Sequence, residues 1–261
     1  MFLHFHIARS LFYLLCSVLL TSCSFIPQAN NPMKMTWHHS KDNDNRKIII
    51  LLPGLWGDRA DFEDHGFIDI AHKNGLTHDF LSVDANAAYL IRGNFPERFM
   101  ADVITPVQSN GYQSIWLLGI SFGGYFALSY YLDHPETIEG VILLSPYTGV
   151  NKERDPMYRI LQFIDRDHSP AKSQQVPYTY WDRLADFEQH NTLDNIYLGY
   201  GRQDDIAPKY NGFKQLLPPE NIHTVAGNHD WPTWSRLWDD LLEMDIVTKS
   251  LHSTARSPPS P

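Results

Sequence analysis

One serine lies in a sequence setting that is typical of a catalytic nucleophile. Ser121 is the centre of a Gly-Ile-Ser-Phe-Gly run, residues 119–123, which follows an apolar, strand-like segment and opens a helix-like one. Glycines on both sides permit a turn so tight that larger side chains would collide, and such a turn lifts the serine hydroxyl above a sheet. A helix-capping serine in a glycine-rich loop is the alternative interpretation. The order of strand, serine and helix favours the nucleophile.

A serine nucleophile needs a base to take its proton, and the base needs a carboxylate to orient it. His229 follows Gly227 and Asn228, between a strand-like and a helix-like segment, and two carboxylates, Asp204 and Asp205, stand earlier in the chain. Asp230, beside the histidine, suits local hydrogen bonding. The sequence has no His-Glu-x-x-His run and no compact His/Asp cluster, so we expect neither a metal nor a nucleotide cofactor.

These residues, in this order, resemble those of an α/β-hydrolase over nearly all of residues 46–247. In that family the acid often stands three residues after a glycine that closes its strand. Gly201 closes a strand-like segment here, so the resemblance implies Asp204 as the acid and Asp205 as the second choice. It implies a catalytic triad of Ser121, Asp204 and His229, in the chain order of this fold.

The resemblance also implies an oxyanion hole made of two backbone amides. One is the amide of Phe122, directly after the nucleophile. The other comes from the loop after an early strand, where Leu55 is the expected donor and Trp56 is the alternative. Pro53 stands where many relatives have a histidine, and there is no His-Gly-Gly-Gly run, which argues against the branch of hormone-sensitive lipases.

The elements that must position these residues alternate along the chain. Buried strands are predicted by apolar runs, and "NFPERFMADVITPVQSNG" and "GGYFALSYYLDHP" predict helices, the first kinked or broken at Pro106. Fully apolar strands that alternate with helices predict an α/β fold with a mostly parallel sheet flanked by helices. The runs taken as strands are "KIIILLPG", "HDFLSVDA", "SIWLLGI", "GVILLSP", "NIYLGYG" and "NIHTVAG".

An insertion interrupts this alternation between about residues 147 and 195, before the strand that carries the acid. It contains two helix-like stretches, and we expect a small helical cap, because a structureless loop of this length is unusual. Its apolar side chains suit either an acyl pocket or the packing of the cap on the sheet. A group of carboxylates there suits either a substrate amine or a solvated helix face: Asp165, Asp167, Asp182, Asp186 and Glu188.

The two ends of the chain differ from the domain at residues 46–250. Residues 1–22 have Arg9, an apolar run and a Leu-Thr-Ser-Cys ending at Cys23, which resembles the lipobox of bacterial lipoproteins. That resemblance implies cleavage before Cys23, a lipid on Cys23 and, because Ser24 follows, sorting to the outer membrane. An ordinary signal peptide or an uncleaved anchor is the alternative. Residues 23–45 are predicted to be a tether, and residues 251–261 a disordered tail.

The pattern as a whole predicts a serine hydrolase that cleaves carboxylic esters with small to medium acyl chains. An amidase or peptidase, a thioesterase, or a non-catalytic lipid-anchored binding module are the alternatives. The partners expected are a small-molecule acyl ester and, through the lipid, a membrane of the bacterial cell envelope. The net charge of −9 and the absence of a basic block argue against nucleic-acid binding. The sequence does not fix the oligomeric state.

Overall fold

The computed structural model describes residues 29–41, 46–92, 94–148 and 192–252, together with Leu184, Phe187 and Glu188. These residues form a seven-stranded sheet in the order β1-β3-β2-β4-β5-β6-β7. Neighbouring strands are parallel except for β1, which is antiparallel to β3. The predicted, mostly parallel sheet is confirmed. The strands are β1 Met35–His38, β2 Lys47–Leu52, β3 Asp79–Val83, β4 Ser114–Ile120, β5 Gly140–Leu144, β6 Ile196–Gly201 and β7 Ile222–Val225.

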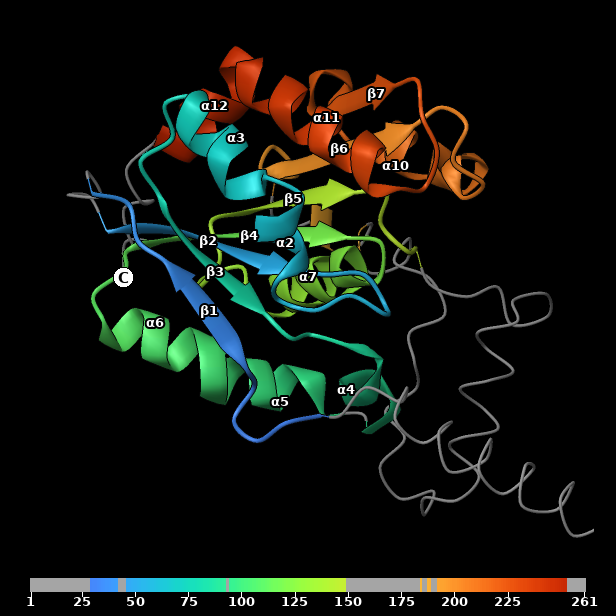
Figure 1. Cartoon of the computed structure of the whole chain (residues 1–261). Helices are drawn as coiled ribbons and strands as arrows, with labels where there is room; N and C mark the ends of the chain where they lie inside the picture. The colour runs from blue at the N-terminus through green and yellow to red at the C-terminus, as the bar shows by residue number, and fades with distance from the viewer. Residues whose placement is uncertain are drawn as a thin grey trace, which may run out of the picture.

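Helices cover both faces of the sheet, as Figure 1 shows. Alternate side chains of β2 point to opposite faces, so Ile48 and Ile50 pack in one core layer and Ile49 in the other. The first layer lies under α5 Phe95–Phe99, α6 Thr105–Ser109 and α7 Phe122–Asp133, and the second under α2 Asp61–Asp64, α3 Phe67–Lys73, α11 Trp231–Glu243 and α12 Asp245–His252. Burial on both faces explains why the central strands read as continuous apolar runs.

The segment with Pro106 is helical, and its proline is accommodated without a break. Between α5 and α6 lies a π-helical turn, η2 Met100–Ile104, and Pro106 then stands in the first turn of α6. A proline has no amide hydrogen and its ring collides with the carbonyl four residues earlier in an α-helix. The wider π turn lies where that collision would occur, and Figure 1 shows α5 and α6 continuing along one axis.

The folded domain begins before and ends after the boundaries that the sequence predicts. The predicted tether contains β1, in which Trp37 stacks on Tyr112 with ring centroids 5.9 Å apart. The predicted tail begins inside α12, where Leu251 is fully buried and its carbonyl accepts a 3.2 Å hydrogen bond from Lys47 Nζ. Both elements are short and lie at margins of the fold, so neither has the long apolar run that reveals the central strands.

Four short helices complete the described part: α4 Ala87–Arg92, the 3₁₀ turns η3 Ala207–Asn211 and η4 Pro219–Asn221, and α10 Phe213–Leu216. The predicted signal peptide and Cys23 lie outside the described residues, as does most of the predicted cap. No helix in the described part of the chain is long and apolar enough to cross a membrane.

Candidate active site

Ser121 lies in a sharp turn between a strand and a helix. β4 ends at Ile120 and α7 begins at Phe122, and Ser121 between them has φ 50° and ψ −112°. A residue with a side chain rarely adopts a positive φ, so the turn is strained. Backbone bonds hold it in place: the Ser121 amide donates to the Leu144 carbonyl at 2.9 Å, and the Ser121 carbonyl accepts from the Tyr147 amide at 2.7 Å. The structure therefore contains the turn that the glycine pattern predicts.

The glycines around Ser121 are required by close backbone contacts. A Cβ at Gly119 would overlap the backbone of Gly123, and a Cβ at Gly123 would overlap the Leu52 carbonyl. Gly124, for which no role is predicted from the sequence, is also needed, because its Cβ would lie 2.7 Å from the Pro146 side chain. These contacts bring α7 and the ends of two strands together beneath the serine.

Three side chains from three loops form a continuous relay. His229 Nε2 lies 2.9 Å from Ser121 Oγ, and His229 Nδ1 lies 2.8 Å from Asp204 Oδ2. An ionised carboxylate can only accept, so Nδ1 carries the proton and Nε2 accepts from the serine hydroxyl. The loops follow β4, β6 and β7, whose carboxyl ends meet at one edge of the sheet. The structure thus brings together the three residues predicted from the sequence.

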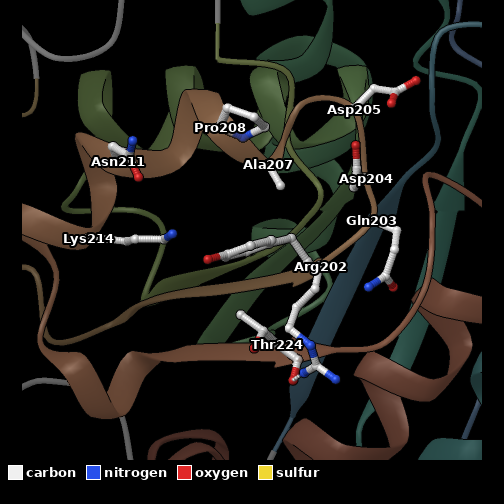
Figure 2. Close-up of a pocket in the computed structure, with 10 residues that line it drawn as sticks. Arg202, Gln203, Asp204, Asp205, Ala207, Pro208, Asn211, Lys214 and Thr224 are labelled. Atoms are coloured by element: carbon white, nitrogen blue, oxygen red, sulfur yellow. Dashed lines mark hydrogen bonds between the residues drawn. The ribbon is translucent and has the colours of Figure 1, made fainter.

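The carboxylate of Asp204 is buried and stabilised in its charged form. Its side chain is 0% exposed, whereas that of His229 is 31% exposed. Burial alone would raise the pKa of Asp204, but hydrogen bonds from His229, the Ile206 amide and Ser145 outweigh burial and lower the pKa. The neighbouring Asp205 is exposed, and Figure 2 shows it at the rim of the loop. The structure therefore places Asp204, and not Asp205, against the histidine.

The acid loop and the histidine loop are bonded to each other. The Gln203 amide donates to the Gly227 carbonyl at 2.9 Å, and the Gly227 amide donates to Gln203 Oε1 at 2.7 Å. A Cβ at Gly201 would overlap the Gly227 carbonyl, so this approach needs glycine on the acid loop. These bonds fix the distance between the two residues that the loops carry.

The histidine ring also has an aromatic neighbour that the sequence analysis missed. Trp234, on α11, meets the ring of His229 edge to face, with centroids 5.0 Å apart. Asp230 caps α11, because its side chain accepts from the Thr233 amide at 3.0 Å. This is the local hydrogen bonding that the sequence predicts for Asp230. The spacing of Trp234, five residues after His229 on the following helix, is the only sequence signal that could have indicated the ring contact.

The two residues predicted to supply the oxyanion amides, Phe122 and Leu55, directly follow Ser121 and Gly54 in the chain. Phe122 is the first residue of α7, so its amide has no acceptor within the helix. Across from it, a Cβ at Gly54 would lie 3.7 Å from Ser121 Cβ. Residues 54–57 form a turn that is closed by a 3.0 Å hydrogen bond from the Gly57 amide to the Gly54 carbonyl. The Leu55 amide takes no part in that hydrogen bond. The loop is thus beside the nucleophile.

Comparison with known proteins gives the same fold. The family described as serine aminopeptidase, S33 matches residues 96–186, about a third of the chain, and the strand–serine–helix turn lies within that range. This match and the order of the strands show an α/β-hydrolase fold. No curated protein matches its sequence.

Solved structures resemble this chain over most of its length. An S-formylglutathione hydrolase from Staphylococcus aureus is 16% identical, with a TM-score of 0.60 over 84% of this chain and 93% of its own. A fluorophosphonate-binding serine hydrolase from the same organism is 15% identical, with a TM-score of 0.61 over 85% and 93%. A monoacylglycerol lipase from Paleococcus ferrophilus is 15% identical, with a TM-score of 0.55 over 83% and 98%. These likenesses show a shared fold.

A polar hollow lies beside the acid loop. It has a volume of about 570 Å³ and is lined by Tyr200, Lys214 and the acid loop (Figure 2). Neither Ser121 nor His229 lines it. Among the described residues, no three His, Cys, Asp or Glu side chains are grouped so that they could hold a metal ion.

Proposed function

We propose that this α/β-hydrolase cleaves carboxylic esters with small to medium acyl chains. The observation that carries the proposal is the relay from Ser121 Oγ to His229 Nε2, at 2.9 Å, and from His229 Nδ1 to Asp204 Oδ2, at 2.8 Å. A base within hydrogen-bond reach of a serine, itself oriented by a buried carboxylate, is the arrangement that makes the hydroxyl nucleophilic.

The first half of the proposed reaction forms an acyl-enzyme. Ser121 Oγ attacks the ester carbonyl carbon while His229 Nε2 takes the hydroxyl proton, and the carbonyl oxygen becomes an oxyanion. The amides of Phe122 and Leu55 donate to that oxyanion. The buried Asp204 carboxylate stabilises the imidazolium. When the C–O bond to the leaving alcohol breaks, the imidazolium gives its proton to the departing oxygen.

The second half releases the acid. A water molecule takes the place of the alcohol, and His229 Nε2 accepts its proton as the water oxygen attacks the acyl carbon. The same two amides hold the second oxyanion. The bond to Ser121 Oγ then breaks, the imidazolium returns the proton to that oxygen, and the free acid leaves. The exposed face of His229 is consistent with access for water, since about a third of the side chain is open.

A second candidate function is amide hydrolysis, because the matching family is described as serine aminopeptidase. Such an enzyme needs carboxylates that hold the substrate amine. Of the acidic group that the sequence offers for this, only Glu188 lies within the described residues, and it is exposed. Comparing p-nitrophenyl esters with aminoacyl p-nitroanilides separates the two functions. We expect turnover of the esters, and a preference for the anilides would favour the peptidase.

The proposal is tested by a fluorophosphonate probe on the soluble protein, residues 24–261, with the adduct located by peptide mass. We expect one adduct, on Ser121, and none in the matched Ser121→Ala variant. A screen of p-nitrophenyl esters from acetate to decanoate, with a formyl thioester tested beside them, then gives the acyl preference. A folded protein without an adduct would contradict the hydrolase and would favour the binding module.

We also propose that Cys23 carries a lipid that anchors the protein in the bacterial cell envelope, in the outer membrane. The Leu-Thr-Ser-Cys sequence supports this proposal. Several acyl chains on one residue give stable anchoring, since burial contributes about 0.8 kcal/mol per CH₂. Cys23→Ser should move the protein from the membrane to the soluble fraction without changing its rate of labelling. A membrane-bound variant would argue against lipidation.

A further inference from the structure

The loop after β2, residues 53–60, is joined to the end of a neighbouring strand by one carboxylate. Asp84 directly follows β3, and its side chain is only 9% exposed. Asp84 Oδ1 accepts from the Arg59 amide at 2.8 Å, and Asp84 Oδ2 accepts from Arg59 Nη1 at 2.9 Å. One buried carboxylate thus holds both the backbone and the side chain of a single loop residue.

Hydrogen bonds within the loop give its second half a defined shape. Asp58 Oδ1 accepts from the Ala60 amide at 2.7 Å, and the Asp58 amide donates to Asp61 Oδ2 at 2.9 Å, where α2 begins. Both bonds join residues at most three positions apart, so they shape the loop but do not fix its place on the sheet. The bonds to Asp84 join this half of the loop to β3.

The first half of the same loop lies beside the candidate nucleophile. A Cβ at Gly54 would lie 3.7 Å from Ser121 Cβ, and Leu55 packs against the core layer that contains Phe122. In the proposed reaction the Leu55 amide donates to the oxyanion. A displacement of about 1 Å at a catalytic group can lower the rate about a hundredfold. Groups that hold this loop in place therefore affect the rate without touching the substrate.

The contact between Arg59 and Asp84 is better suited to fixing a geometry than to adding stability. Removing a carboxylate from water costs free energy, so a buried ion pair often contributes little net stability. Charge-assisted hydrogen bonds between an arginine and a carboxylate do, however, fix the orientation of the two groups. Asp84 is itself held in place, because its amide donates to the Lys34 carbonyl at 2.9 Å, in the segment before β1.

We propose that Asp84 is a positioning residue that, through Arg59, holds the loop after β2 in the place beside Ser121 that oxyanion binding requires. The inference rests on the proposed serine-hydrolase function. The bond to the Arg59 amide sets the path of the backbone, and the bond to the guanidinium keeps the carboxylate turned toward the loop. Leu55 is four residues before Arg59, so release of Arg59 would let the Leu55 amide move.

The test begins with Asp84→Asn, which keeps the size of the side chain but turns an amide nitrogen toward one of the two Arg59 donors. We expect kcat for a p-nitrophenyl ester to fall about tenfold with little change in KM, a smaller loss than that of a whole oxyanion donor. Arg59→Ala keeps the backbone bond to the carboxylate and should lose about two- to threefold. Adding Arg59→Ala to Asp84→Asn lets the asparagine oxygen face the backbone amide, and should restore kcat to within about threefold of the wild type.

The matched control is Asp102→Asn. The Asp102 side chain is also 9% exposed, and it accepts from a backbone amide, that of Met33 at 2.9 Å, and from an arginine, Arg98. These partners lie in the segment before β1 and in α5, not in the loop after β2. The control should therefore lower the Tm without lowering kcat, with every rate measured at a temperature where a thermal melt shows the variant to be folded.

The outcomes separate positioning from a merely structural role. If Asp84→Asn keeps the wild-type kcat while its Tm falls, the pair only stabilises the fold and the inference is wrong. It is also wrong if adding Arg59→Ala fails to restore the rate, or if Asp102→Asn loses as much kcat as Asp84→Asn. Any of these results with an active wild type overturns the role of Asp84 alone. A wild-type protein with neither ester turnover nor fluorophosphonate labelling overturns the proposed function itself.

Discussion

Asp204→Asn tests whether the buried carboxylate is the acid of the relay. The change keeps the size of the side chain, and its oxygen can still accept from the Ile206 amide, so the acid loop should keep its shape. It removes the negative charge that faces His229 Nδ1 at 2.8 Å. With the amide nitrogen toward the ring, the histidine would hold its proton on the wrong nitrogen.

The size of the effect follows from the geometry. The charge centres of a carboxylate and an imidazolium in such contact are about 4 Å apart, and at an effective dielectric constant of about 20 they attract by about 4 kcal/mol. That energy acts only when the imidazolium forms, so its loss lowers kcat by about a thousandfold. The wrong tautomer adds to the loss, toward about ten-thousandfold.

The assay is p-nitrophenyl ester turnover, with fluorophosphonate labelling as a second readout and a thermal melt to show that each variant is folded. Asp205→Asn is the matched control, since Asp205 is the exposed neighbour on the same loop. We expect the control to keep activity within about twofold, as surface substitutions away from a site usually have small effects. Equal losses in the two variants, or more than a tenth of the wild-type kcat in Asp204→Asn, would refute the assignment.

Three further outcomes are expected. Gly123→Ala should lower the free energy of unfolding, measured by urea titration, by about 3 kcal/mol, because the added Cβ would overlap a backbone carbonyl. Gly54→Ala is the control and should fold normally, since its Cβ meets only ordinary contacts. Ending the chain at residue 244 removes the buried side chains of Val247 and Leu251 and should cost about 3–6 kcal/mol in the same titration. The pKa of Asp204 is lowered in the folded state, so its negative charge stabilises the fold above about pH 4, and this contribution is lost as the pH falls. The amount by which the Tm of the wild-type protein exceeds that of Asp204→Asn should therefore shrink between pH 6 and pH 3.

The three residues of the candidate relay could be predicted from the sequence because each has a local signature. Ser121 stands between glycines that the tight turn requires, and His229 and Asp204 each follow a glycine at a strand end. Parallel strands bring their carboxyl ends to one edge, so three loops far apart in the chain meet there. The central strands could also be predicted from the sequence, since burial on both faces of the sheet requires continuous apolar runs.

The residues that the sequence did not reveal act through contacts between elements. Trp234 meets the histidine ring through the direction in which α11 leaves its loop. Likewise β1 is half-buried, and its place at the sheet edge comes from pairing with β3 and from stacking by Trp37.

The reversed direction of β1 determines how the protein would sit on a surface. Met35, its first residue, pairs with Val83, the last residue of β3, so the chain enters the sheet at the edge where the catalytic loops lie. β1 and β4 are three strand spacings apart, about 14 Å. Fully extended, residues 24–29 span at most about 20 Å. If Cys23 carries a lipid, as we propose, the bilayer would lie on the side of the sheet where the chain enters, which is also the side of the Ser121 loop.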